Sequence, residues 1–274
     1  MPVKILVTVK RIPDPDESLK FAGNAIDTSS SKWVSNAFDE YAVETALRLA
    51  EHIGGKDRLA EVIVLSVCPK DKRQHVTQFL AMGADRAIIV DAEESSIDAQ
   101  SVAKLVAEVF RREGCDLLVL GKLSQDTESN EVAQRVAGLL DLPQAAFAAT
   151  LRWDRAGKAL SVGREVDDGV ETKTLPLPAV VSVDLRIVLP GSVKNGATPD
   201  EHKYSEGARL ASLRGITMAK RKKVDVLEPA QLGVTPTAHV QPAGVTAPPR
   251  RAAGQIVDSP EALIHKLVTE AKVL

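Results

Sequence analysis

The sequence predicts an α/β protein whose core is a doubly wound, mostly parallel sheet, with antiparallel edge strands and an extended C-terminal arm. The first observation is a set of short, nearly continuous apolar runs in the first half, which suit parallel strands covered on both faces. The second is a helical pattern between these runs, and the third is a change to closely spaced strands and turns after Pro143. The predicted parallel strands are residues 3–9, 61–67, 87–91 and 116–120.

Amphipathic helices connect these strands. Apolar residues recur at intervals of three and four from 43 to 50 and again from 102 to 109, so each segment has one apolar face. Residues 74–82 are predicted to form a third helix, which Gly83 ends as a residue that tolerates positive φ. Strand–helix–strand alternation implies right-handed crossovers and therefore a doubly wound sheet.

The second half of the chain has a different pattern. Four strands are predicted at 148–153, 158–166, 170–175 and 179–186, separated by short turns such as 154–157 and 167–169. They indicate an antiparallel meander, or hairpins that join the edge of the sheet. The following segment, 188–210, is rich in Gly, Pro, Asn and Ser and has no apolar period. We expect it to be a long loop, and long loops in compact proteins are usually functional or mobile.

The tail combines one β-like run at 224–227, a Pro-rich extended segment through Pro248-Pro-Arg-Arg251, and a last helix at 260–271 with Ser259 as its N-cap. A tail that cannot bury itself suggests an arm that lies on another subunit. We therefore expect three parts. They are an α/β domain at 1–188, a loop region at 189–223 and the C-terminal arm at 224–274.

Composition excludes several classes of protein. The 274 residues carry a formal net charge of −2 and only 3% aromatic residues, which argues against a nucleic-acid binder. The two cysteines, Cys68 and Cys115, adjoin apolar runs, so a reducing compartment is favoured over a disulfide framework. No signal-peptide pattern and no membrane-spanning run is present, and we expect a soluble, cytoplasmic protein with no membrane insertion.

Signatures of common catalytic sites are absent from the sequence. There is no G-x-G-x-x-G after the first strand, no G-x-x-x-x-G-K-[ST], no G-x-S-x-G, and no Ser-Gly-Gly-x-Asp-Ser loop. The five histidines are scattered without a partner pattern, and neither cysteine has metal-ligand spacing. The residues therefore predict no catalytic group and no metal site.

The most informative stretch is 116–130, an apolar run followed by a polar turn, which continues into a helical pattern at 131–140. One interpretation is an ordinary loop capped by Asp126, Thr127 or Ser129. The other is a phosphate-binding turn, in which Gly121 permits close backbone approach and the amides of 129–132 point at an anion. Asp126 and Glu128 would repel a phosphate unless they turn outward.

Two further segments have both an ordinary and a functional interpretation. Asp39 and Glu40 stand in the first turn of a predicted helix, where the helix dipole alone explains two carboxylates. The neighbouring Asn36 and Phe38 are not explained in this way and could face a base or a ring. The basic run Lys220-Arg-Lys-Lys223 is either a solvated face or a docking site for an acidic partner.

Landmarks along nearly the whole chain resemble the β subunit of electron transfer flavoprotein. No single landmark is specific, whereas the set in this order is. The landmarks are Val9-Lys-Arg11, Asn36-x-Phe-Asp-Glu-x-Ala-Val-Glu44, Ala81-Met-Gly-Ala-Asp-Arg86, Gly121-Lys122 with the 126–130 loop, Arg164-Glu-Val-Asp-x-Gly169-x-Glu171, Leu177-Pro-Ala-Val-Val181, Lys220-x-Lys-Lys223 and Pro248-Pro-x-Arg251-x-x-Gly254.

The resemblance implies an adenine-nucleotide α-hydrolase-like fold at 1–188 and a heterodimer with a larger α subunit. That subunit would hold most of a redox-active FAD, while this chain would hold a structural AMP. Electrons would pass from acyl-CoA and other dehydrogenases of fatty acid β-oxidation to a quinone oxidoreductase, in a cytoplasm or, in a eukaryote, a mitochondrial matrix. The positions that match the AMP pocket are Thr8, Asn36, Ala37, Phe38, Asp39, Val67, Gly121, Lys122, Leu123, Ser124, Gln125, Asp126, Thr127, Glu128, Ser129, Asn130, Glu131 and Val132.

The resemblance also implies roles outside the AMP pocket. Phe38 falls near the flavin side of the subunit interface. Leu213 matches the anchoring leucine of a partner-recognition loop, which docks into an apolar pocket of acyl-CoA dehydrogenases. The arm at 224–274 would contact the α subunit.

Departures from the family pattern keep other functions open. Ile12-Pro-Asp14 is similar to an electron-bifurcating, nitrogen-fixation-type branch that holds a second FAD in place of AMP and meets NADH. Lys122, Asn130 and Phe38 instead match the AMP branch. Residues 190–207 resemble an insertion, Ala37 replaces a usual proline, and Met218 replaces a frequent lysine. A third alternative is a stand-alone adenine-nucleotide sensor without a partner.

Overall fold

A single ten-stranded sheet forms the centre of the protein. The structure is a computed structural model and describes residues 3–240, 242–247, 249 and 253–274. Across the sheet lie β11 (Gly169–Pro176), β10 (Ala159–Val166), β9 (Gln144–Asp154), β12 (Ala179–Val183), β8 (Leu117–Gly121), β1 (Val3–Thr8), β6 (Ala60–Cys68), β7 (Arg86–Asp91) and β14 (Val224–Leu227), and β13 (Val193–Lys194) pairs separately with β9.

The chain order makes the sheet doubly wound. The strands pair in parallel from β9 through β12, β8, β1, β6 and β7 to β14, while β10 runs antiparallel to both β9 and β11. From β1 the chain moves outward to β6 and β7, and it then returns to place β8 on the other side of β1. The order therefore reverses between β1 and β8, and such a reversal opens a crevice at the carboxyl ends of the strands.

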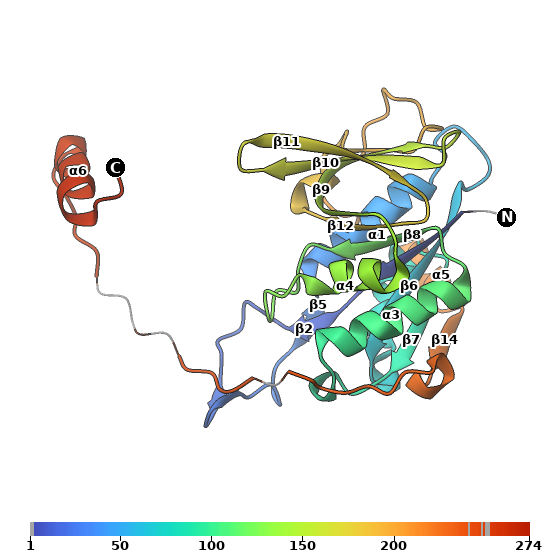
Figure 1. Cartoon of the computed structure of the whole chain (residues 1–274), viewed down its shortest axis with the longest axis horizontal. Helices are drawn as coiled ribbons and strands as arrows, with labels where there is room; N and C mark the ends of the chain where they lie inside the picture. The colour runs from blue at the N-terminus through green and yellow to red at the C-terminus, as the bar shows by residue number, and fades with distance from the viewer. Residues whose placement is uncertain (1–2, 241, 248, 250–252) are drawn as a thin grey trace.

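Helices cover both faces of the sheet and make three layers (Figure 1). The helices are α1 (Ala37–Ala50), α2 (Gln74–Met82), α3 (Ala99–Glu113), α4 (Glu131–Leu140), α5 (Leu213–Ala219) and α6 (Pro260–Lys266). Successive strand residues point to opposite faces. Ile5 and Val7 thus pack with α1 and α2, whereas Leu6 packs with α3 and α4.

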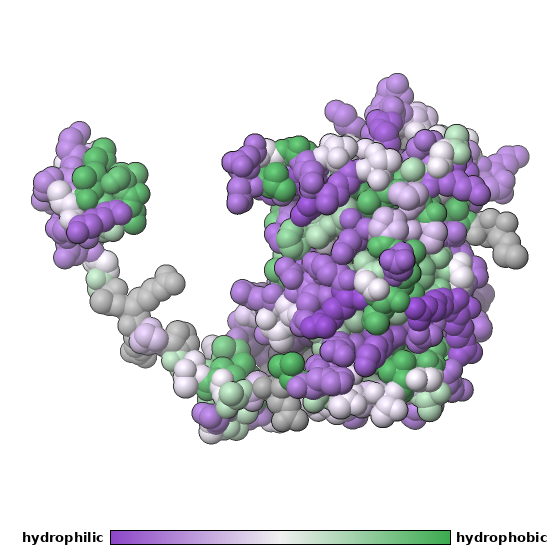
Figure 2. Space-filling model, viewed as in Figure 1, coloured by the Kyte–Doolittle hydropathy of each residue, from purple (hydrophilic) through white to green (hydrophobic). Residues whose placement is uncertain are grey.

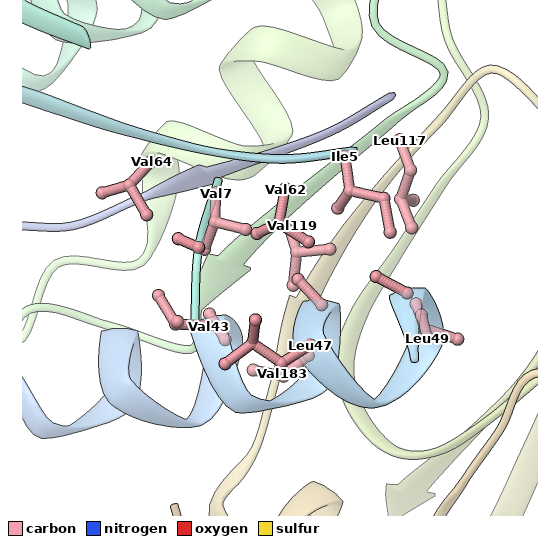
Figure 3. Close-up of a cluster of buried hydrophobic side chains, with 14 of the residues drawn as sticks. Ile5, Val7, Val43, Leu47, Leu49, Val62, Val64, Leu117, Val119 and Val183 are labelled. Atoms are coloured by element: carbon pink, nitrogen blue, oxygen red, sulfur yellow. The ribbon is translucent and has the colours of Figure 1, made fainter. Parts of the chain in front are cut away.

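The face under α1 is fully buried. Figure 3 shows Val43 and Leu47 of α1 pointing toward Val7, Val62 and Val119 of three adjacent parallel strands. Both faces of these strands are covered, so their sequences are nearly continuous apolar runs.

The predicted parallel strands and helices are confirmed within one or two residues at most boundaries. The helix predicted at 74–82 has the bounds of α2, and Gly83 ends it at φ 138°. The predicted run at 224–227 is β14, and Ser259 caps α6 by accepting a hydrogen bond from the Ala262 amide. The last helix continues from α6 as a π-helical turn at Leu267–Ala271.

Two predictions for the second half are wrong in part. The strand predicted at 179–186 ends at Val183, because the Asp184 carboxylate accepts the Arg186 amide and starts a 3₁₀ helix, Leu185–Val188. This strand, β12, is also not part of the antiparallel group, since it lies parallel between β8 and β9. The long loop predicted at 188–210 contains β13 and the buried Asn195, so the body of the protein holds it in place.

The segment from 11 to 35 was not predicted and forms a small excursion over one end of the sheet. Strands β2 (Arg11–Pro13) and β5 (Trp33–Ser35) pair antiparallel, and a hairpin of β3 (Phe21–Ala22) and β4 (Ala25–Ile26) lies between them. Strands of two or three residues have no detectable alternation, so the sequence pattern could not identify them.

The first part of the C-terminal arm lies on the body, whereas α6 near its end lies apart from the body in Figure 1. Figure 2 shows an apolar face on this helical end of the chain. Leu263 and Ile264 of α6 and Val268 of the π-helical turn are each about half exposed. The Pro-rich prediction at Pro248-Pro-Arg-Arg251 lies outside the described residues except for position 249. No helix in the described part of the chain is long and apolar enough to cross a membrane.

Candidate functional site

A cavity of about 580 Å³ lies at the carboxyl edge of the sheet, where the strand order reverses. It is formed by the ends of β1, β6 and β8, the turn after β8, and the first turns of α3 and α4. Its size is within the range of small-molecule and cofactor sites. Of the predicted AMP-pocket positions, those that line the cavity are Thr8, Asn36, Asp39, Val67, Gly121, Leu123, Ser124, Asp126, Thr127, Ser129, Asn130, Glu131 and Val132.

The remaining predicted positions lie beside the cavity and do not line it. Phe38 is half-buried, with its ring edge-on to Tyr41 at a centroid distance of 6.0 Å. Lys122 points to the other side of β8, where its Nζ lies 2.8 Å from an Asp184 carboxylate oxygen. Glu128 is exposed in the turn at φ 51°. The last two, Ala37 and Gln125, belong to the contact between two loops that is described next.

The start of α1 is joined to the turn after β8 by side-chain amides. Asn36 donates from Nδ2 to the Leu123 carbonyl at 2.9 Å and accepts the Gln125 amide at 3.1 Å. The Gln125 side chain in turn accepts the Ala37 amide at 2.9 Å. The first amide of α1 is therefore satisfied by a side chain from another loop.

The start of α4 has no such partner. Its N-cap residue is Asn130, which makes no side-chain capping bond, and the predicted caps Asp126, Thr127 and Ser129 make none either. The first carboxylate of the helix, on Glu131, lies 2.5 Å from Arg135 one turn later. Residues 130–133 line the cavity, and the amides at this helix start have no side-chain acceptor, which is an arrangement suited to an anion. The loop therefore lacks the side-chain cap that the first interpretation of the sequence expects from Asp126, Thr127 or Ser129.

Asp39 forms the floor of the cavity between β1 and β8. The residue is 6% exposed, and its carboxylate accepts the Lys10 amide at 2.7 Å. Burial raises the pKa of Asp39 to about 7, although hydrogen bonds from the Lys10 and Gly121 amides act in the opposite direction. A Cβ at Gly121 would lie 2.5 Å from an Asp39 oxygen and 2.8 Å from Phe38, so only glycine fits here.

Lys10 and Arg11 also line the cavity, although the sequence predicts no role for them beyond the family landmark Val9-Lys-Arg11. The Lys10 Nζ lies 2.7 Å from an Asp126 carboxylate oxygen. Arg11 stacks over Trp33 at 4.1 Å and forms two hydrogen bonds with Glu94, at 2.9 and 2.6 Å. Basic residues at the end of a strand that faces a ligand turn are the signal that could have identified them.

Two segments from distant parts of the chain form the outer wall of the cavity. One is the 11–35 excursion, and the other is the first part of the C-terminal arm, through Val240. The arm is fastened to the start of α3, where Asp98 accepts the His239 amide at 2.8 Å and the Ser101 hydroxyl donates to the Thr237 carbonyl at 2.6 Å.

The cavity has both apolar and polar walls. Its apolar wall is made by side chains that include Leu65, Val67, Val102 and Leu120, which suits a flat organic ring. Among the described residues, no group of three His, Cys, Asp or Glu side chains is placed to hold a metal ion.

The predicted docking residue lies far from the cavity in sequence, at the start of α5. Leu213 is 86% exposed. Ser212 caps the helix by accepting the Gly215 amide at 3.0 Å, and a Cβ at Gly215 would lie 2.3 Å from the Ala81 carbonyl oxygen. The short helix is therefore packed tightly on the end of α2 while its first leucine faces solvent.

The basic run at 220–223 is not simply a solvated face. Lys222 donates from Nζ to the carbonyls of Leu80 and Ala84, at 3.0 and 2.6 Å, and so satisfies the end of α2. Burial lowers the pKa of Lys222.

The fold and the cavity define the class of protein: a doubly wound α/β chain with a ligand-sized cavity at the switch point of its sheet. Residues 24–232 match the family described as the electron transfer flavoprotein domain. The chain is 37% identical to the human "Electron transfer flavoprotein subunit beta" over 270 residues, which covers 97% of this chain and 96% of that protein.

Two further relatives have the same name. The Bradyrhizobium diazoefficiens subunit is 38% identical over 99% of this chain and 100% of its own length. The mitochondrial subunit of Oryza sativa subsp. indica is 36% identical over 99% of this chain and 100% of its own. This chain therefore belongs to the electron transfer flavoprotein family and, within it, to the β subunits.

Proposed function

We propose that the chain is the β subunit of a heterodimeric electron transfer flavoprotein and that its cavity binds AMP. The observation that carries the proposal is the uncapped start of α4 at the switch-point cavity. The phosphate would accept hydrogen bonds from the amides around Asn130–Val132, and the adenine ring would contact the apolar wall near Val67. The AMP has a structural role in this proposal, as the family resemblance implies.

The FAD belongs mainly to the α subunit in this proposal, and it supplies the electron-accepting and electron-donating chemistry when bound. Phe38 is the residue proposed to contact the flavin, since its half-buried side chain lies in the first turn of α1, next to Gly121 of the cavity wall. The apolar face of α6 and the arm that leads to it are the surfaces proposed to contact the α subunit. This chain acts as part of an electron carrier and not as an enzyme with its own active site.

The partners in electron transfer are proposed to be acyl-CoA and other dehydrogenases as donors and a quinone oxidoreductase as acceptor. Leu213 supports the docking role, because α5 holds it exposed on a tightly packed support. We place the heterodimer in a cytoplasm, or in the mitochondrial matrix if the source is eukaryotic. The three-part division at 188 and 223 remains a proposal, in which β14 of the third part still completes the main sheet.

Experiments on the isolated chain test whether it binds AMP by itself while the FAD depends on the α subunit. We expect it to bind AMP with a 1:1 stoichiometry in a calorimetric titration and to have no flavin absorbance until the α subunit and FAD are added. Purification of the isolated chain with stoichiometric FAD would contradict the proposal.

An electron-bifurcating subunit is the second candidate. It is favoured by Ile12-Pro-Asp14 and by the extent of the cavity, which reaches Trp33 and Val240 beyond the strand ends. In that case the cavity would hold a second FAD, and NADH would reduce the heterodimer. A stand-alone nucleotide sensor has no comparable support, because the chain belongs to a family of subunits.

A further inference from the structure

The side chain of Lys10 reaches from the end of β1 to the turn that precedes α4. Its Nζ lies 2.8 Å from the Ser124 hydroxyl and 2.8 and 2.7 Å from the two carboxylate oxygens of Asp126. Ser124 also donates to Asp126. The three side chains therefore form one hydrogen-bonded cluster on the cavity wall.

The backbone of Lys10 is held on both sides, whereas its side chain is not buried. The Lys10 amide donates to Asp39 at 2.7 Å, and its carbonyl accepts the Asn36 amide at 2.9 Å. The Lys10 side chain is 42% exposed and that of Asp126 is 24% exposed. The ammonium group can therefore exchange one acceptor for another without a change in the backbone, and an ammonium imposes little geometry on its partner.

The other basic residue on the cavity wall, Arg11, is less able to exchange. Its guanidinium is held by two hydrogen bonds to Glu94 and by the Trp33 ring, and its side chain is only 12% exposed. Lys10 is thus the cation on the described cavity wall that an incoming anion could take from its present partner.

We propose that Lys10 is a ligand of the nucleotide phosphate and that Asp126 is the group the phosphate displaces from it. This inference rests on the proposed AMP site and adds a residue to it. A phosphate monoester has a charge of about −1.5 to −2 at pH 7, so it competes well with a single carboxylate for the ammonium. Asp126 is then an internal competitor, and its carboxylate sets how tightly the cavity holds an anionic nucleotide.

The alternative role for the same ion pair is a latch that holds the turn after β8 against β1. The two roles predict different changes in ligand affinity when Lys10 or Asp126 is replaced. A latch makes the loss of either partner harmful to any ligand of the cavity. A displaced competitor makes the two losses opposite in direction, and only for a ligand that has a phosphate.

The test is a calorimetric titration of the wild-type chain and of the variants K10M and D126N, each with AMP and with adenosine. We expect K10M to weaken AMP binding about 10-fold or more, as the loss of a charge-assisted hydrogen bond implies, and D126N to tighten it about threefold or more. Adenosine affinity should stay within about twofold in both variants. K10R, which retains the charge, should recover most of the AMP affinity.

A matched control is K70M, since Lys70 has a similar ion pair with Asp91 at 2.7 Å but does not line the cavity. It should leave AMP affinity unchanged. Equal weakening of AMP and adenosine by K10M and D126N would overturn the inference in favour of the latch, and unchanged AMP affinity in both would overturn it outright. Wild-type chain that binds no AMP would overturn the proposed function, and this inference with it. Thermal melts of each variant show whether it is folded.

Discussion

The two ends of α1 each adjoin a cluster of charged and polar groups, but only one end is suited to a ligand. At the C-terminal end, the fully buried Arg48 donates to Glu44 at 2.7 Å, and Arg209 bridges Glu44 and Glu51. Asn195 donates to the Arg48 carbonyl at 2.9 Å. The Arg48 guanidinium also donates to backbone carbonyls of the 188–207 segment, at Val188, Leu189, Ser205 and Gly207.

At the N-terminal end, the balance of donors and acceptors is different. The cavity has amides at the start of α4 without side-chain acceptors, and the ammonium of Lys10 is partly exposed. Charge alone therefore does not mark a ligand site in this protein. The C-terminal cluster satisfies its own groups and fastens the 188–207 segment to the body, whereas the N-terminal one leaves donors for an external anion.

The largest expected effect is on the free energy of unfolding, and it concerns Arg48 near the C-terminal end of α1. R48M leaves Glu44 buried without its helix partner and removes hydrogen bonds to several carbonyls, so we expect a loss of about 3–5 kcal/mol in the free energy of unfolding. Urea denaturation measures this loss. AMP affinity of the folded protein should be unchanged. The control R152M breaks an exposed pair with Asp200 in the same segment and should cost less than about 1 kcal/mol. Similar costs for the two variants would remove the distinction between the two ends.

The next effect is on the cavity floor. In G121A the new methyl group would overlap Asp39 and the backbone of Phe38, and we expect AMP affinity to fall at least about tenfold with a stability loss of about 1–3 kcal/mol. The control is G138A, on the exposed side of α4, where a Cβ meets nothing within 4 Å. It should stabilise the protein slightly, by up to about 1 kcal/mol. AMP affinity that survives G121A would show that the ligand does not use this floor.

The third effect depends on pH and concerns Asp39. Because burial raises the pKa of this carboxyl from 3.8 to about 7, the folded state keeps its proton where the unfolded state has lost it. The Asp39 contribution to stability is therefore fully present below about pH 4 and is lost progressively as the pH rises to about 7. D39N removes this dependence, so the variant should gain stability relative to wild type between pH 4 and 7. A difference that is constant with pH would contradict the raised pKa.

The smallest effect on stability is expected at Leu213. This exposed side chain, like the donors of the cavity, is available to a partner. L213A should change the free energy of unfolding by less than about 0.5 kcal/mol, because the side chain is 86% exposed. It should raise the KM for a dehydrogenase partner in an electron-transfer assay and leave flavin content unchanged. L139A, at an exposed position of α4, is the control and should leave KM unchanged.

Much of the fold follows from local pattern, because buried parallel strands and amphipathic helices have strong periodic signals. The position of β12 does not, since nothing in residues 179–183 distinguishes an edge strand from one inserted between β8 and β9. Of the site, the turn after β8 was predictable from its own residues. Lys10 and the Asn36–Gln125 contact were not, because they depend on how two loops 87 to 116 residues apart meet.

We propose that the cavity at the start of α4 holds an AMP, while a flavin held mainly by another chain carries the electrons. The most direct measurement is to co-express the chain with its α subunit, release the nucleotides from the purified heterodimer and identify and count them by mass. The account predicts one FAD and one AMP per heterodimer. Two FAD per heterodimer, or one FAD with no adenine nucleotide, would contradict it.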